Sequence, residues 1–211
     1  MINFFGLGSD SVNFDNVKPG TFPPFWTSTA NRPAGTAKWV VLRDATAPSG
    51  FNVLVKPATQ ATDSEFPMAV FDKDICRDGD LSVKFKIQAT TRRIKTAGLI
   101  WRYQDPQNYY LLHFSVEEKN IVLFRVQDGQ VRPIPVTGSK PGAFGVPHEL
   151  KPGQWYVAKV IFRGNNIRVL FGNRQLFEAM DDTLPNAGKT GVWTRGATEA
   201  AFDDFRIDKK S

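Results

Sequence analysis

One set of polar and aromatic residues has the chemistry needed to bind a sugar. Aromatic rings pack against the apolar face of a pyranose, and burying that face removes apolar area from water. Arginine, asparagine and histidine side chains donate hydrogen bonds to the hydroxyl groups around the ring. The predicted ligand-binding residues are Arg102, Asn108, Tyr109, His113, Arg125, Trp193 and Arg195.

The Cys and His content excludes several other kinds of site. The only cysteine is Cys76, so an intrachain disulfide cannot form, and the only histidines are His113 and His148. No Cys/His spacing typical of a zinc site exists. We therefore expect no required cofactor, and no residue is predicted to be catalytic.

The charge is basic but dispersed. Lysine and arginine together number 27 against 21 acidic residues, which gives a net charge of +6. Since the basic clusters are short and lack nucleic-acid-binding motifs, we expect no nucleic-acid partner. No apolar run reaches the roughly 20 residues of a membrane span, and the first residues do not resemble a secretory signal.

The elements that must position the candidate residues are β-strands. Gly and Pro recur throughout the chain, no segment has a convincing helical period, and the intervening runs alternate as strands do. This pattern predicts an all-β chain of two stacked antiparallel sheets, forming one domain over residues 1–211. Residues 1–37 are expected to be an irregular segment pinned by aromatic rings such as Phe22, Phe25 and Trp26.

Alternation within the expected strands assigns side chains to faces. For residues 109–116 the predicted core-facing set is Tyr110, Leu112, Phe114 and Val116. For residues 121–127 the predicted core-facing set is Val122, Phe124 and Val126. This assignment places Arg102, Tyr109, His113 and Arg125 on the face opposite the core. Trp193 and Arg195 are expected to extend that face, and Asn108 is expected at its rim, in the turn that begins at Asp105.

Several motifs in a fixed order carry a resemblance to a known family. They are AGLIWRYQDPQNYY at 97–110, NIVLFRV at 120–126, GQWY at 153–156, GKTGVWT at 188–194 and FDDF at 202–205. This order resembles the bacterial laminin G-like and 3-keto-disaccharide hydrolase-like domains of the concanavalin A-like lectin/glucanase superfamily, over residues 14–208. The resemblance implies an antiparallel jelly-roll β-sandwich that binds or is associated with carbohydrate outside the cytoplasm.

The resemblance also implies two features that the sequence supports less well. Many sandwiches of this superfamily hold a structural calcium ion, and Asp203 and Asp204 are the predicted ligands, although turn-capping is a common role for such aspartates. Its glucanases carry two glutamates around an aspartate on one strand, and no run of this sequence matches that spacing.

Two alternatives to a sugar-binding role stay open. A glycoside hydrolase would have to assemble an unusual carboxylate pair from distant loops, using residues such as Asp105, Asp181 or Asp182. A structural or protein-interaction sandwich would instead meet an acidic partner through its basic surface. The sequence defines neither the sugar nor the oligomeric state.

Overall fold

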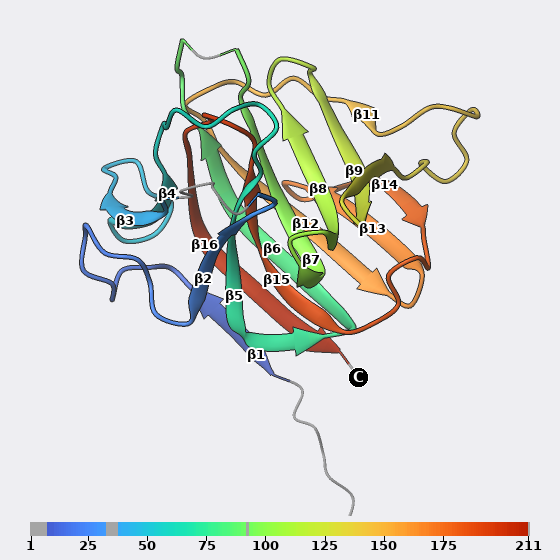
Figure 1. Ribbon diagram of the computed structural model, residues 1–211, viewed down its shortest axis with the longest axis horizontal. Helices are drawn as coiled ribbons and strands as arrows, with labels where there is room; N and C mark the ends of the chain where they lie inside the picture. The colour runs from blue at the N-terminus through green and yellow to red at the C-terminus, as the bar shows by residue number, and fades with distance from the viewer. Residues whose placement is uncertain (1–7, 33–37, 92, 211) are drawn as a thin grey trace, which may run out of the picture.

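The computed structural model describes residues 8–32, 38–91 and 93–210, and within them two antiparallel sheets are stacked as a sandwich (Figure 1). The first sheet has the order β14 (Arg174–Met180), β13 (Asn166–Phe171), β12 (Trp155–Arg163), β6 (Asp78–Ile87), β16 (Ala200–Lys210), β4 (Asn52–Lys56) and β3 (Val40–Arg43), with β1 (Ser9–Val12) also paired to β16. The second has the order β10 (Gln130–Pro133), β9 (Asn120–Gln127), β8 (Asn108–Ser115), β7 (Thr96–Asp105), β15 (Gly188–Thr194), β5 (Pro67–Cys76) and β2 (Trp26–Ala30), with β11 (Val146–Pro147) on β9. The predicted all-β, two-sheet architecture is confirmed.

The main core lies between the two sheets and is built from alternate residues of each strand. Tyr110 and Leu112 of β8 contribute to it from the second sheet, and Phe85 of β6 contributes from the first. Trp101 is fully buried there, with its ring stacked 5.4 Å from Tyr110 and 5.9 Å from Phe162. This core fixes which side chains of the second sheet must point to the sheet's outer face.

The N-terminal segment contains two strands, β1 and β2, which join different sheets. Trp26 is buried and its ring contacts those of Phe14, Phe71 and Phe205. Phe25, by contrast, is exposed. Residues 1–7 and 33–37 of the predicted segment lie outside the described residues.

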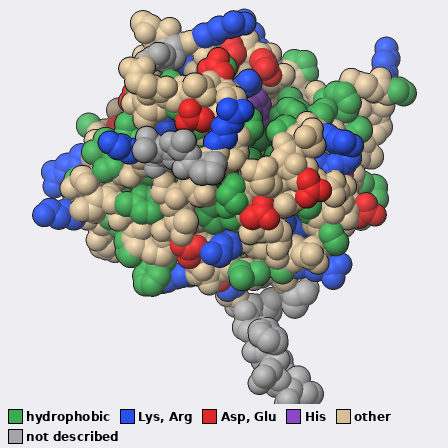
Figure 2. All heavy atoms as spheres, in the orientation of Figure 1, with side chains coloured by type: hydrophobic (Ala, Val, Ile, Leu, Met, Phe, Trp, Pro, Cys, Tyr) green, Lys and Arg blue, Asp and Glu red, His purple; other side chains and the backbone are tan. Residues whose placement is uncertain are grey.

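The surface agrees with the dispersed charge of the sequence. On the face shown in Figure 2, basic and acidic side chains are interspersed with apolar ones. The described part of the chain contains no helix that is long and apolar enough to cross a membrane.

The face assignment predicted for residues 121–127 is wrong. β8 and β9 pair His113 with Val122 and Leu111 with Phe124, so these four side chains share the outer face. Ile121 and Leu123 belong to the main core. The alternation was misleading because residues 121–124 are all apolar, and a shift of one residue reverses every side chain.

Arg102 was predicted to lie on the outer face, and that prediction is wrong. Its side chain lies inside the sandwich. A bulge in β7 interrupts its pairing with β8 after Trp101, and Arg102 has a positive φ of 46°. The bulge turns its side chain inward, leaving it 2% exposed. The guanidinium donates to the carbonyls of Arg77 (2.8 Å), Leu184 (3.1 Å) and Gly164 (2.6 Å), and to the Asp78 carboxylate at 3.3 Å.

We predict that Arg102→Lys lowers the free energy of unfolding by about 3 kcal/mol. A lysine ammonium cannot reach all four acceptors, so buried carbonyls would lose their partners. A guanidinium chloride titration measures the change. The matched control is Arg168→Lys, because Arg168 is exposed on β13. Equal stabilities for the two variants would contradict the bonding role of Arg102.

Candidate functional site

The outer face of the second sheet carries its own buried apolar cluster. Its members are Met68, Val70, Ile100, Tyr109, Leu111, Val126 and Trp193. Gly98 makes room for this cluster: a β-carbon there would lie 2.5 Å from Leu111 Cδ1 and 3.4 Å from Trp193 Cε3. The absence of a side chain at Gly98 therefore allows Trp193 to pack against the neighbouring strands.

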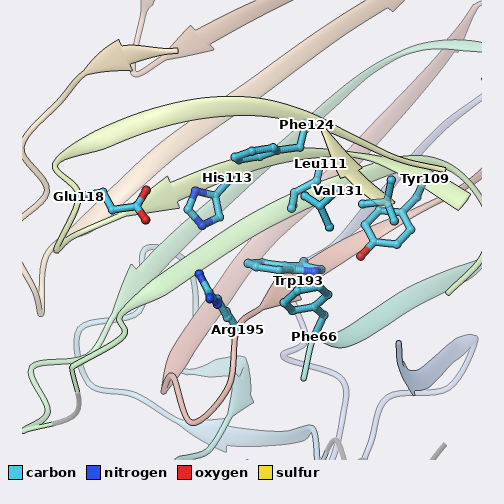
Figure 3. Close-up of a pocket in the computed structure, with 10 residues that line it drawn as sticks. Phe66, Tyr109, Leu111, His113, Glu118, Phe124, Val131, Trp193 and Arg195 are labelled. Carbon is cyan, nitrogen blue, oxygen red and sulfur yellow. The ribbon is translucent and has the colours of Figure 1, made fainter. Parts of the chain in front are cut away.

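A small hollow opens over this cluster (Figure 3). Its volume is about 90 Å³, and its lining includes Phe66, Tyr109, His113, Phe124, Trp193 and Arg195. β8 supplies Tyr109 and His113, β9 supplies Phe124, and β15 supplies Trp193. Phe66 lies directly before β5, and Arg195 directly after β15.

Burial divides the lining into a floor and walls. Tyr109, Trp193 and His113 are only 0%, 2% and 6% exposed, so they form the floor. Phe66 and Phe124 are half-buried and form the walls. A ligand in the hollow would therefore touch the edges of the floor rings and pack mainly against the two phenylalanines.

His113 is a neutral group at the bottom of the hollow. Its ring lies edge-on to Phe124 and Trp193, with centroids 5.5 and 5.6 Å away. Burial, with a smaller effect from the Arg195 charge, lowers the pKa of His113 to about 4. Its buried Nδ1 has no hydrogen-bond partner among the described residues. Leaving a buried polar atom unpaired is costly, and a ligand group that reached it would supply the missing hydrogen bond.

Two further hollows extend the site along β8. A second hollow of about 220 Å³ shares Phe66, Tyr109 and Val126 with the first. A third, of about 610 Å³, shares Asn31, Pro106 and Gln107 with the second. Neighbouring hollows share lining residues, so the three lie in a row along β8, and we call this row the β8 groove.

Four of the predicted ligand-binding residues come together in the first hollow: Tyr109, His113, Trp193 and Arg195. Asn108 lies at the far end of the groove, in the third hollow. Its amide donates to the Asp105 carboxylate at 3.1 Å and accepts the backbone N–H of Asp128 at 3.0 Å. The side chain therefore stabilises the turn as well as lining the rim.

Arg125 lies on the opposite side of the sheet from the groove, which corrects its predicted placement. Its guanidinium pairs with the carboxylate of Asp181, which also accepts a hydrogen bond of 2.7 Å from Tyr110 Oη. The reversed face of β9 explains this outcome, because Arg125 follows Leu123 into the interior. Arg102, inside the sandwich, likewise does not contribute to the groove.

Phe66, Phe124 and Glu118 line the hollow but were not predicted as site residues. Phe124 was assigned to the core by the reversed alternation. Phe66 precedes β5, far from β8 in the sequence, and no motif marks it. Glu118 lies in the turn that follows β8.

The aspartates predicted to bind calcium have protein partners. The fully buried Asp203 accepts hydrogen bonds from the backbone N–H groups of Ser49 (3.1 Å) and Asp204 (2.7 Å), and burial raises its pKa to about 6. Asp204 pairs with Lys84 at 2.7 Å. Among the described residues, no three His, Cys, Asp or Glu side chains come together as a metal site. This arrangement does not favour calcium, which stays a prediction that a melting curve with and without chelator checks.

We predict that His113 makes the protein less stable in acid. The pKa of His113 is about 4 in the folded state and 6.5 without burial, so between these values only the unfolded chain binds the proton. The free energy of unfolding should thus fall by about 3 kcal/mol from this residue as the pH drops from 7 to 4. His113→Phe should remove that part of the loss, as measured by denaturant titrations at both pH values.

The matched control for this measurement is His148→Phe, which changes the only other histidine. It should retain the full loss of stability in acid. If His113→Phe retained it as well, the neutral state of His113 in the folded protein would be disproved.

The comparisons with known proteins identify the fold. No protein-family model and no curated protein sequence matches this chain. Among solved structures, the carbohydrate-binding module CBM66 from Bacillus subtilis is similar, with 14% identity, a TM-score of 0.63, and coverage of 86% of this chain and 94% of that chain. A β-glucanase from Bacillus licheniformis has 11% identity and a TM-score of 0.62, with coverage of 96% and 99%.

A protein of unknown function with a galectin-like fold, also from Bacillus subtilis, has 13% identity and a TM-score of 0.54, with coverage of 87% and 89%. Likeness at such low identity establishes architecture and no more. The predicted fold is thereby confirmed: the chain is a concanavalin A-like jelly-roll β-sandwich.

Proposed function

We propose that this chain binds carbohydrate in the β8 groove. The observation that carries the proposal is the composition of the groove, in which aromatic side chains adjoin hydrogen-bonding groups along one strand. Phe66 and Phe124 offer apolar surface to the face of a sugar ring. His113 and Arg195 at one end and Gln107 at the other offer hydrogen bonds to hydroxyl groups.

The length of the groove favours a chain of sugars over a single ring. From His113 to Asn108 the strand advances five residues, or roughly 17 Å at the usual rise of an antiparallel strand. The three hollows cover this stretch and differ in volume. An oligosaccharide lying parallel to β8 would make contacts in all of them.

The similar structures support a carbohydrate ligand, since one is a carbohydrate-binding module and another is a β-glucanase. We also propose that the protein works outside the cytoplasm, because the polysaccharides that such proteins bind are found there.

Binding without hydrolysis is the activity that the hollow supports. Most glycosidases need two carboxyl groups, separated by about 5 to 10 Å across the scissile bond. Of the described residues that line the first hollow, Glu118 alone carries a carboxylate. Asp105 and Asp128 lie in the third hollow, at the other end of the groove. Asp181, which was considered for a hydrolase, is engaged with Arg125 and Tyr110.

We predict that Phe66→Ala and Phe124→Ala each weaken glycan binding by about tenfold, because each removes apolar surface that a sugar ring would cover. A glycan array at moderate salt first identifies the ligand, and titration calorimetry then gives the affinities. Val157→Ala is the matched control, because Val157 is exposed on β12 of the other sheet. Its affinity should equal that of the unmodified protein.

Two results would contradict the proposal. A blank array would favour a structural or protein-interaction role, and unchanged affinity in both phenylalanine variants would place the ligand elsewhere. Release of new reducing ends from the bound glycan, abolished by Glu118→Gln, would instead establish a hydrolase.

A further inference from the structure

Arg195 is a cation at one end of the β8 groove, and part of its guanidinium is not used in hydrogen bonds to the described residues. Its Nε donates to the carbonyl oxygen of Asp63 at 2.8 Å, which orients the guanidinium. The two Nη groups can then donate hydrogen bonds to a ligand. Arg102, Arg125, Arg163 and Arg206 all pair with carboxylates, whereas Arg195 forms no ion pair within the described part of the chain. In Figure 3 its guanidinium points towards the ring of His113.

The positive charge of Arg195 acts within the hollow itself. Burial is the main cause of the low pKa of His113, and the charge of Arg195 lowers that pKa further. Glu118 also lines the hollow, but it is exposed to solvent and lies beside the imidazole of His113 (Figure 3). A group bound between His113 and Arg195 would lie next to the positive charge of Arg195.

The size of the hollow limits what can enter it. With a volume of about 90 Å³, it is the smallest of the three hollows along β8, and the other two measure about 220 and 610 Å³. It can hold a charged substituent of a ring that lies against Phe66 and Phe124. His113, which is only 6% exposed, lines this space, and its buried Nδ1 has no hydrogen-bond partner among the described residues.

We propose that the Arg195 end of the groove selects a carboxylate-bearing sugar, so that the ligand is a glycan containing uronic acid units. This inference rests on the proposed carbohydrate-binding function and specifies its ligand class. The ligand carboxylate pairs with the Nη groups of Arg195, in the forked geometry that guanidinium and carboxylate share. His113 adds a hydrogen bond from the floor, and the sugar rings continue along β8.

A hydroxymethyl group at the same position would not use this arrangement equally well. It is neutral, and it offers one oxygen where a carboxylate offers two, so it cannot accept a paired set of bonds from the guanidinium. The discrimination should fall as salt is raised, because Arg195 is partly exposed to solvent.

The test compares uronic acid oligomers with their own carboxyl-reduced forms. Oligomers of polygalacturonate, alginate and glucuronoxylan are titrated into the protein by calorimetry, before and after chemical reduction of their carboxyl groups to alcohols. We expect at least one uronate series to bind, and its reduction to weaken binding by about tenfold or more. This comparison changes the ligand and leaves the fold intact.

Protein variants then locate the selectivity. Arg195→Gln should abolish the preference for the unreduced form, and Arg195→Lys should retain part of it, since lysine keeps the charge and loses the fork. Arg168→Gln removes an exposed positive charge from the other sheet and should bind as the unmodified protein does.

The outcomes separate this inference from the function on which it rests. Equal binding of reduced and unreduced oligomers, or binding of neutral glycans alone, would overturn the acidic-sugar inference and leave carbohydrate binding in place. A preference for uronates that survives in Arg195→Gln would overturn the role of Arg195. No binding of any glycan, acidic or neutral, would overturn both.

Discussion

Burial of the second sheet on both of its faces is the constraint on which the rest of the structure depends. Seven of the eight residues of β8 are buried, although successive side chains point to opposite sides. Tyr110, Leu112 and Phe114 fill the main core, and Tyr109, Leu111 and His113 form part of the outer floor. Packing on one face therefore holds the side chains of the other in place, and the groove is built on a rigid strand.

Arg102 satisfies buried polar groups at the place where β7 departs from regular strand pairing. The bulge after Trp101 turns Arg102 towards backbone carbonyls of neighbouring segments, and such groups are costly to bury without a partner. One guanidinium satisfies three of them and a carboxylate, and its Cζ lies 5.9 Å from the ring centres of both Tyr110 and Phe162. Arg102, which the sequence predicted to bind a ligand, thus makes structural hydrogen bonds inside the sandwich.

The sequence predicted the features that depend on local pattern and missed those that depend on register. Alternation and turn residues were sufficient for two antiparallel sheets, and they placed Tyr109 and His113 on the outer face. They failed for Arg125, because a strand with apolar residues on both faces gives the same pattern in either orientation. Phe66 could not be predicted as a neighbour of Trp193, with ring centroids 5.4 Å apart, because only the pairing of β5 with β15 brings them together.

The burial of the floor also determines how the site can act. Trp193 and Tyr109 are too enclosed to serve as open stacking platforms, so their rings shape the hollow while the half-buried phenylalanines provide the contact surface. A floor that is already packed loses little conformational entropy when a ligand arrives, and such preorganisation favours affinity. Selectivity must then come from the polar groups that have no hydrogen-bond partner among the described residues. At this end of the groove these include the outer nitrogens of Arg195, His113 Nδ1, Tyr109 Oη and Trp193 Nε1.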